Sequence, residues 1–151
     1  MSGCRHKCKG CFNCEAWDFG YGKEFTEDTI DEIIECLDKE YITGLTLLGG
    51  EPLERENQKG LVPLVKKVKE KFPQKDIWCF TGFKLEEDIM DNMYKNWNET
   101  KELISNIDVL VDGKFEEDKK NITLKFRGSE NQRLLNVPEC LKHKKAIKVE
   151  I

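Results

Sequence analysis

The feature that most constrains the fold is an alternation of helical and strand patterns between residues 26 and 113. Apolar residues recur at helical spacing in three stretches, at 26–37, 60–72 and 85–104, the last with a possible interruption near 96–98. Each stretch is followed by a short run rich in strand formers, at 42–48, 76–81 and 107–111. Each run ends at glycine: Gly49-Gly50, Gly82 and Gly113. This order predicts an α/β fold with a parallel sheet whose carboxyl edge collects functional loops.

Beyond Lys114 the alternation stops. The run Ile122-Thr-Leu-Lys-Phe126 predicts a further strand, and residues 146–151 predict a last one. The polar segment between them, Arg127–Arg133, predicts no regular element.

The N-terminus carries three thiols, Cys4, Cys8 and Cys11, at C-x3-C-x2-C spacing, and Cys14 follows closely. Three cysteines in one loop can bind three irons of a 4Fe–4S cluster and leave the fourth iron open for another ligand. A tetrahedral zinc site closed by Cys14 is the alternative, although such sites usually join two separate cysteine pairs. The spacing therefore favours a cluster over zinc.

The other cysteines give weaker signals. Cys36 and Cys79 lie in apolar patterns and are predicted to be buried, whereas the pattern around Cys140 predicts nothing. Seven cysteines, an odd number, and no export signal argue against a disulfide framework.

Length and charge limit the remaining possibilities. A chain of 151 residues predicts one domain, 1–151, with a single core. The net charge of −4 gives no basic field that would attract nucleic acid. No apolar run approaches the ~20 residues that cross a bilayer, and no signal peptide is visible, so we expect a cytoplasmic protein without a membrane partner.

Five motifs occur in order along the chain. They are the string Cys-x-His-x-Cys-x-Gly-Cys-Phe-Asn at 4–13, Gly49-Gly-Glu-Pro52, Trp78–Phe83, Val109–Phe115 and Arg127–Arg133. Together they resemble the anaerobic ribonucleoside-triphosphate reductase activating proteins, a branch of the radical S-adenosyl-L-methionine (SAM) enzymes. Gly10 supports this branch, because most radical SAM enzymes carry an aromatic residue at that position.

The resemblance implies a fold, an incomplete (β/α) barrel with parallel strands. A full barrel typically needs about 250 residues, so an open barrel suits a chain of this length. Relatives carry a further segment before the cysteine loop that forms the first barrel strand. We therefore expect that strand to be missing here and the edge of its neighbour to be unpaired.

The resemblance also implies a set of site residues. Cys4, Cys8 and Cys11 would bind three irons of a 4Fe–4S cluster, and the amine and carboxylate of SAM would chelate the fourth. The turn Gly49-Gly50-Glu51 would hold the SAM amine, because a glycine turn exposes carbonyls and a carboxylate favours an amine donor. The backbone of Gly10, Cys11 and Phe12 would lie against the nucleoside of SAM.

The implied reaction needs no general acid or base from the protein. An electron from a flavodoxin- or ferredoxin-type donor would cleave SAM, and the 5′-deoxyadenosyl radical would take a hydrogen atom from a glycine of the large reductase subunit. The cofactors would supply the chemistry and the chain would orient them.

Two other functions for the chain, and the role of one of its segments, remain open at this point. The chain could activate another glycyl-radical enzyme, such as pyruvate formate-lyase, or it could be a non-catalytic zinc or iron–sulfur binding module. The segment Arg127–Arg133 could dock the large subunit, close over SAM, or form a solvated loop held by its own hydrogen bonds.

Overall fold

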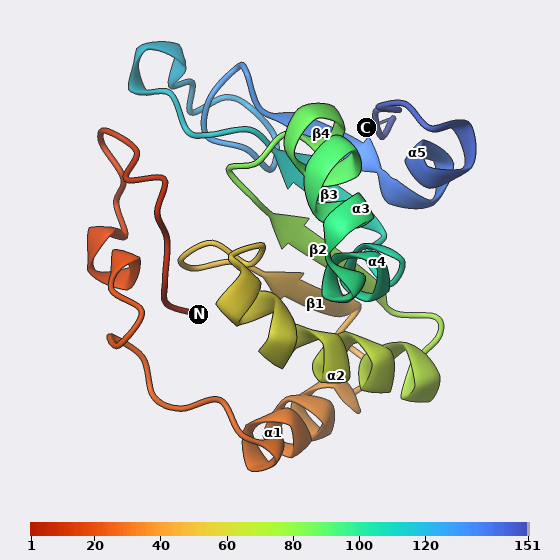
Figure 1. Cartoon of the computed structure of the whole chain (residues 1–151). Coiled ribbons are helices and arrows are strands. Elements are labelled where there is room, and N and C mark those ends of the chain that lie inside the picture. The colour runs from red at the N-terminus through yellow and green to blue at the C-terminus, as the bar shows by residue number, and fades with distance from the viewer. Residues whose placement is uncertain (151) are drawn as a thin grey trace.

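A four-stranded sheet lies at the centre of the computed structural model, which describes residues 1–150 (Figure 1). The strands are β1 (Gly44–Leu47), β2 (Asp76–Phe80), β3 (Val109–Asp112) and β4 (Arg133–Asn136), in that spatial order. The first three run parallel, whereas β4 pairs antiparallel with β3. The α/β class and the three parallel strands are confirmed, but the sheet is mixed and does not close.

The helices occupy most of the remaining chain. They are α1 (Glu27–Leu37), α2 (Arg55–Lys71), α3 (Tyr94–Asn96), α4 (Asn98–Ile104) and α5 (Val137–His143), with a π-helical stretch at Leu85–Met93 and 3-10 turns at Cys14–Trp17 and Glu117–Lys119. The helix predicted over 85–104 is broken at Trp97, whose backbone is extended. This break confirms the predicted interruption.

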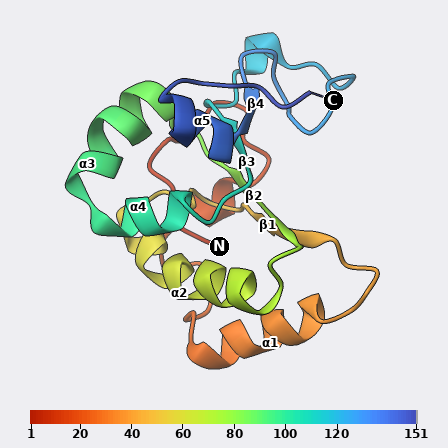
Figure 2. The same ribbon diagram turned by 90° about the vertical axis from the view of Figure 1, so that its right-hand side faces the viewer.

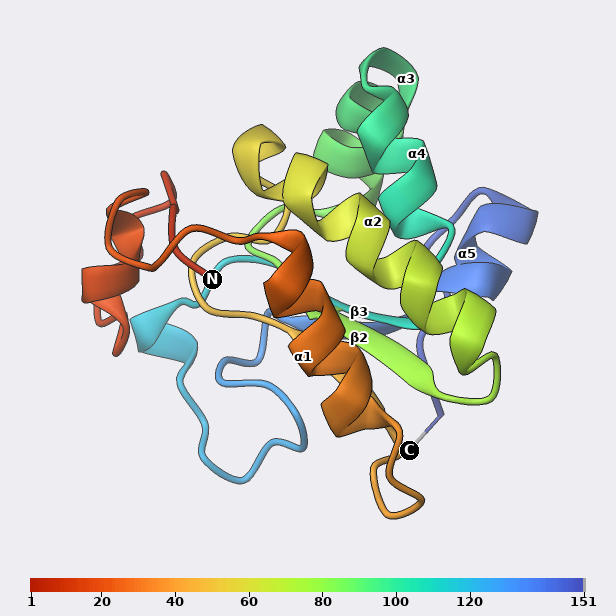
Figure 3. The same cartoon turned by 90° about the horizontal axis from the view of Figure 1, so that it is seen from below.

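One face of the sheet forms the core. Leu47, Ile77, Cys79 and Leu110 lie side by side on three strands, and each is at most 3% exposed. They share one apolar cluster with the inward residues of α1, α2 and α4. Figure 3 shows α2 and α4 on one side of the sheet. The alternation of inward and outward side chains along a strand thus assigns these positions to the helical layer.

The opposite face is covered by irregular chain. Trp78 points to this side, where its ring meets Phe126 edge-to-face with centroids 5.2 Å apart. Phe126 belongs to the long connection between β3 and β4, which passes on the side of the sheet away from the helices (Figures 2 and 3). The second layer is therefore a loop rather than a helix.

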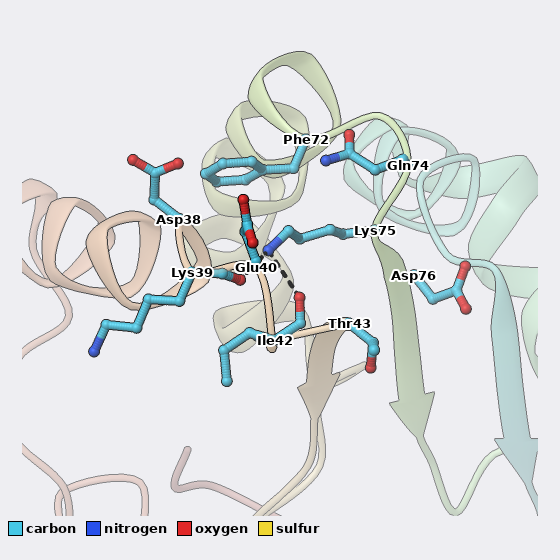
Figure 4. Close-up of a pocket in the computed structure, with 9 residues that line it drawn as sticks. All are labelled: Asp38, Lys39, Glu40, Ile42, Thr43, Phe72, Gln74, Lys75 and Asp76. Carbon is cyan, nitrogen blue, oxygen red and sulfur yellow. Dashed lines mark hydrogen bonds between the residues drawn. The ribbon is translucent and has the colours of Figure 1, made fainter.

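A buried lysine joins the amino ends of β1 and β2. Lys75 is 7% exposed, and its ammonium donates to the carbonyl of Leu37 at the end of α1. It also donates to the carbonyls of Lys39 and Ile42, between α1 and β1 (Figure 4). It also lies 5.2 Å from the centroid of the Phe72 ring. These contacts satisfy all three ammonium protons, so the adjoining surface hollow of about 460 Å³ reflects a structural joint at the edge opposite the cysteine loop.

The two strand predictions for the C-terminal third have different outcomes. The segment 122–126 is not a strand: Asn121 accepts from the backbone N–H and hydroxyl of Thr123, which turns the chain. The segment 146–150 forms one antiparallel bridge, Lys148 with Leu135, with hydrogen bonds from Asn136 N to Ile147 O at 2.8 Å and from Val149 N to Leu134 O at 2.9 Å, and residue 151 lies outside the described residues. Strand β4 and helix α5 were not predicted.

Two cysteine predictions have different outcomes. Cys79 is fully buried, as predicted, but Cys36 is exposed, because α1 turns only its Ile30, Ile34 and Leu37 side toward the core.

No helix within residues 1–150 combines the length and apolar character that a bilayer crossing requires.

Candidate cluster site

The cysteine loop lies at the carboxyl edge of the parallel strands (Figure 1). Its base is closed by two backbone hydrogen bonds, from Gly3 N to Ala16 O at 2.8 Å and from Cys4 N to Trp17 O at 3.1 Å. Ala16 is 3% exposed, so this base is anchored in packed structure. The loop between the two bonds contains Cys4, Cys8, Cys11 and Cys14.

The glycine turn after β1 packs directly against the start of the chain. Gly50 N donates to Met1 O and Glu51 N donates to Gly3 O, both at 2.8 Å. A Cβ on Gly49 would lie 2.5 Å from the backbone of Met1, and one on Gly50 would lie 2.6 Å from the Gly3 carbonyl. Gly49 also has a φ of +126°, which disfavours any other residue. The two glycines therefore allow the cysteine loop and the turn to touch.

Glu51 is a buried carboxylate with four hydrogen-bond donors around it. It is 1% exposed. One oxygen accepts from Leu53 N at 2.8 Å and from the Thr81 hydroxyl at 2.7 Å. The other bonds to His6 Nε2 and accepts from Gly82 N, both at 2.7 Å. Two carboxylate oxygens offer about four acceptor positions, so the protein itself satisfies this side chain.

His6 carries the link from Glu51 into the cysteine loop. Its side chain is 7% exposed and lies edge-to-face on Phe83, with ring centroids 4.4 Å apart. A Cβ on Gly82 would lie 2.6 Å from the imidazole, so the ring occupies space that exists only because residue 82 is glycine. The histidine between Cys4 and Cys8 is thus held by the ends of β1 and β2.

A second contact holds the opposite side of the loop. The backbone N–H of Phe115 lies near the Cys8 thiol and acts to lower its pKa. Glu117 lies beside Gly10 and is 3.9 Å from the ammonium of Lys9. Both residues belong to the segment that follows β3, so three successive strand ends contact the cysteine loop.

The segment Arg127–Arg133 supports that second contact. Gln132 accepts from Gly128 N and Ser129 N and donates to Gly113 O at 3.0 Å. Asn131 donates to Lys114 O at 2.7 Å. Two of these bonds reach outside the segment, so its amide side chains bind the chain that leads to Phe115 and Cys8.

Arg133 has a different task. Its guanidinium donates to Asp112 at 2.9 and 2.5 Å and to Glu86 at 3.0 and 2.7 Å. Asp112 is 1% exposed and also accepts from Leu85 N at 2.9 Å. The arginine therefore fastens β4 to β3 and to the π-helical stretch.

The thiols of the loop are free, and they differ in exposure. Cys4, Cys8 and Cys11 are half-buried and Cys14, the first residue of a 3-10 turn, is exposed. Burial raises the pKa of the Cys4 thiol, as do Glu51 and Cys8, while the backbone N–H groups of His6 and Lys7 oppose the shift. Burial also raises the pKa of the Cys8 thiol, and the neighbouring Cys11 adds to it.

These thiols have the chemistry that a 4Fe–4S cluster requires. Backbone N–H groups near Cys4 and Cys8 partly oppose the upward pKa shift that burial causes, and such groups tune the potential of a cluster. Within residues 1–150 no three His, Cys, Asp or Glu side chains converge closely enough for one metal ion. Each thiolate of a cluster binds a different iron, so its ligands need not converge on one point.

The residues predicted from the sequence thus occupy one region. Gly10 and Phe12 lie with the cysteines, and Gly49, Gly50 and Glu51 lie against the base of the loop. Phe12 is 96% exposed. Sequence reasoning assigned no role to His6, Thr81, Gly82 or Phe115, although each stands inside one of the five motifs; the histidine two residues before Cys8 was the available signal.

Comparisons with known proteins place the chain in a family. A family model described as "4Fe-4S single cluster domain" matches residues 1–135. The chain is 44% identical over 136 residues to the anaerobic ribonucleoside-triphosphate reductase-activating protein of Enterobacteria phage T4, covering 89% of this chain and 79% of that protein. No solved structure gives a significant match.

Bacterial relatives agree. Proteins of the same name match over 134 residues in Pasteurella multocida, at 42% identity, and in Escherichia coli K12, at 40%. Each alignment covers 87% of this chain, with 81% and 82% of the relative. The chain belongs to the family of anaerobic ribonucleoside-triphosphate reductase-activating proteins, which confirms the resemblance seen in its motifs.

Proposed function

We propose that this chain is a radical SAM activase that generates a glycyl radical on the large subunit of an anaerobic ribonucleoside-triphosphate reductase. The observation that carries the proposal is the joining of the cysteine loop to the Gly49-Gly50-Glu51 turn by backbone hydrogen bonds at the strand ends. Membership of the activating-protein family supports the same reaction and favours it over a binding module.

The cofactors supply the radical chemistry. A bound 4Fe–4S cluster would supply the electron for reductive cleavage of SAM, and SAM would supply the radical that removes a hydrogen atom from the glycine of the partner. The electron comes from a flavodoxin- or ferredoxin-type donor. We assign the fold to an open version of the radical SAM barrel.

The residues of this chain bind and orient these groups. Cys4, Cys8 and Cys11 hold three irons, and the backbone N–H of Phe115 stabilises the Cys8 thiolate. Gly49 and Gly50 present backbone atoms to the amine of SAM, and the backbone at Gly10–Phe12 contacts its nucleoside. No side chain transfers a proton.

Electron paramagnetic resonance (EPR) tests the proposal. The chain is reconstituted anaerobically with iron and sulfide, reduced with dithionite and measured with and without SAM. We expect a 4Fe–4S signal that changes shape on addition of SAM, and then a glycyl-radical signal when the large subunit is added. A zinc-bound protein without an iron signal would instead support a non-catalytic binding module.

Cysteine variants locate the cluster. Cys8→Ala should abolish both iron binding and SAM cleavage, because no other thiol replaces the missing ligand. Cys14→Ala is the matched control from the same loop and should retain both. Survival of the cluster in Cys8→Ala, or its loss in Cys14→Ala, would overturn the ligand assignment.

A further inference from the structure

We infer that His6 is a positioning residue, which fixes the cysteine loop against the glycine turn through its hydrogen bond to Glu51. Glu51 then acts on the site through this bond rather than as a direct ligand of the SAM amine. The consequence of this bond, that it aligns the cluster with SAM, rests on the proposed function. The hydrogen bond between His6 and Glu51 does not depend on the proposed function, because it is present in the structure without cofactors.

The first support is the saturation of Glu51. Four donors surround its two oxygens at 2.7–2.8 Å, and the side chain is buried. A SAM amine that bound this carboxylate would have to displace one of them and leave a buried polar group unpaired. Backbone atoms of Gly49 and Gly50 require no such exchange.

The second support is the pocket built for the imidazole. Phe83 packs on the ring, and the missing side chain of Gly82 leaves the space in which it lies. Gly82 is not in the left-handed region, so its backbone conformation alone does not require glycine. Residue 82 is therefore glycine because any larger side chain would collide with the imidazole of His6.

The third support is the position of His6 in the chain. Its backbone N–H faces the Cys4 thiol, while its side chain reaches the end of β2 through Glu51 and Gly82. Other bonds hold the neighbouring backbone: Cys4 N donates to Trp17 O at 3.1 Å, and Arg5 N donates to the Glu54 carboxylate at 3.0 Å. The His6 bond ties the segment between Cys4 and Cys8 to Glu51 and the end of β2, so its loss should loosen the Cys4 side of the loop.

Alkylation of the protein without cluster measures this directly. Thiols are labelled with iodoacetamide and quantified residue by residue by mass spectrometry. In His6→Leu we expect Cys4 to react about tenfold faster, the scale set by one hydrogen bond to a charged group. Exposed Cys14 and buried Cys79 are internal references whose rates should not change. His6→Gln keeps an N–H donor and should restore most of the protection.

Further variants distinguish loss of the His6–Glu51 hydrogen bond from a general loss of stability. His143 is the other histidine, an exposed partner of Glu139 in α5, so His143→Leu should leave Cys4 protected. Gly82→Ala should expel the ring and reproduce His6→Leu, yet add little in a His6→Ala background, since residues that act through one contact are not additive. Gly20→Ala is the glycine control, because its Cβ would meet only ordinary contacts.

The loaded protein gives the functional readout. The SAM concentration that half-converts the EPR signal should rise about 10–100-fold in His6→Leu, the range found when groups that orient metal ligands are removed. An unchanged Cys4 alkylation rate in His6→Leu, or a His6→Gln variant as reactive as His6→Leu, would overturn the inference. A wild-type cluster indifferent to SAM, with Cys4 still released in His6→Leu, would remove the proposed function and leave the anchoring role standing.

Discussion

Two buried carboxylates, Glu51 and Asp112, lie beyond or at the ends of β1 and β3, on either side of β2. Both are 1% exposed and both accept several hydrogen bonds. Asp112 is neutralised by the guanidinium of Arg133, which belongs to β4. Glu51 is held by a hydroxyl, two backbone N–H groups and His6 of the cysteine loop.

The difference between these sites is the kind of chain that each one fastens. The Asp112 network joins two strands and a helix, so it stabilises the fold. The Glu51 network joins two strand ends to an irregular loop that has little core of its own. A buried, hydrogen-bonded carboxylate therefore stabilises the fold at the end of β3, whereas after β1 it fixes the geometry of the candidate site.

The largest expected effect is on the folding side. Arg133→Met would leave the Asp112 carboxylate buried with only the Leu85 N–H. Breaking a buried pair in this way typically costs 3–5 kcal/mol, and we expect about 3 kcal/mol here because Arg133 is partly exposed. Urea unfolding of the protein without cluster measures the change in the free energy of unfolding.

A matched control removes an exposed ion pair instead. Lys66→Met breaks the pair of Lys66 with Glu102 and should cost at most about 1 kcal/mol. The double variant Asp112→Leu/Arg133→Met should recover part of the loss, because it leaves no unpaired charge. Equal stability of Arg133→Met and the wild type would refute the structural role of this pair.

A smaller loss of stability is expected at the other carboxylate. Glu51→Gln places an NH2 group where two donors already point, so we expect a loss of about 2 kcal/mol from unpaired buried groups. Its main effect should be local: faster alkylation of Cys4, as in His6→Leu. Glu139→Gln, on the surface of α5, is the control. If Arg133→Met released Cys4 as strongly under native conditions, the two networks would be one unit.

The sequence predicted the part of the fold that repeats a simple pattern. The strands at Gly44–Leu47, Asp76–Phe80 and Val109–Asp112 follow helices with clear apolar spacing and end at glycines. The cysteine loop and the glycine turn were both recognised because glycine and cysteine have few interchangeable roles. Their contact follows from parallel strands sharing one carboxyl edge.

The C-terminal third could not be predicted in the same way. Ile122 and Phe126 alternate as in a strand, but they are 90% and 57% exposed, and Asn121 offers the backbone a turn instead. Strand β4 has four residues and depends on pairing with β3. Helix α5 did carry a signal: Asn136 accepts from Glu139 N as an N-cap, and Pro138 stands in the first turn.

The partners of the buried carboxylates were also beyond the sequence. His6 and Glu51 are 45 residues apart, and Arg133 and Asp112 are 21 apart. Neither pair follows a helical or strand period, so only the folded chain brings them together. The segment Arg127–Arg133 was therefore recognised as a motif, but its structural role was not predicted. That role is to bind the segment after β3 and to fasten β4 to β3.

The smallest expected effect concerns Arg5, the exposed contact of the cysteine loop. Its guanidinium bonds to Glu56 at 2.7 and 3.1 Å and also to Glu54. The hydrogen bond from Arg5 lowers the pKa of Glu56 to about 2. A carboxyl whose folded pKa is depressed stabilises the fold above its usual value, about 4.3, and loses that contribution as the pH falls toward 2.

The side chains of Arg5 and Glu56 are 60% and 53% exposed, so solvent and salt screen this pair and its effect on stability should be slight. Nuclear magnetic resonance titration of the protein without cluster should place the Glu56 midpoint near 2, and Arg5→Ala should return it toward its usual value. Arg5→Ala should nevertheless leave Cys4 protected from alkylation, because the His6 bond remains. Release of Cys4 in Arg5→Ala as large as in His6→Leu would instead show that the exposed pair holds the loop.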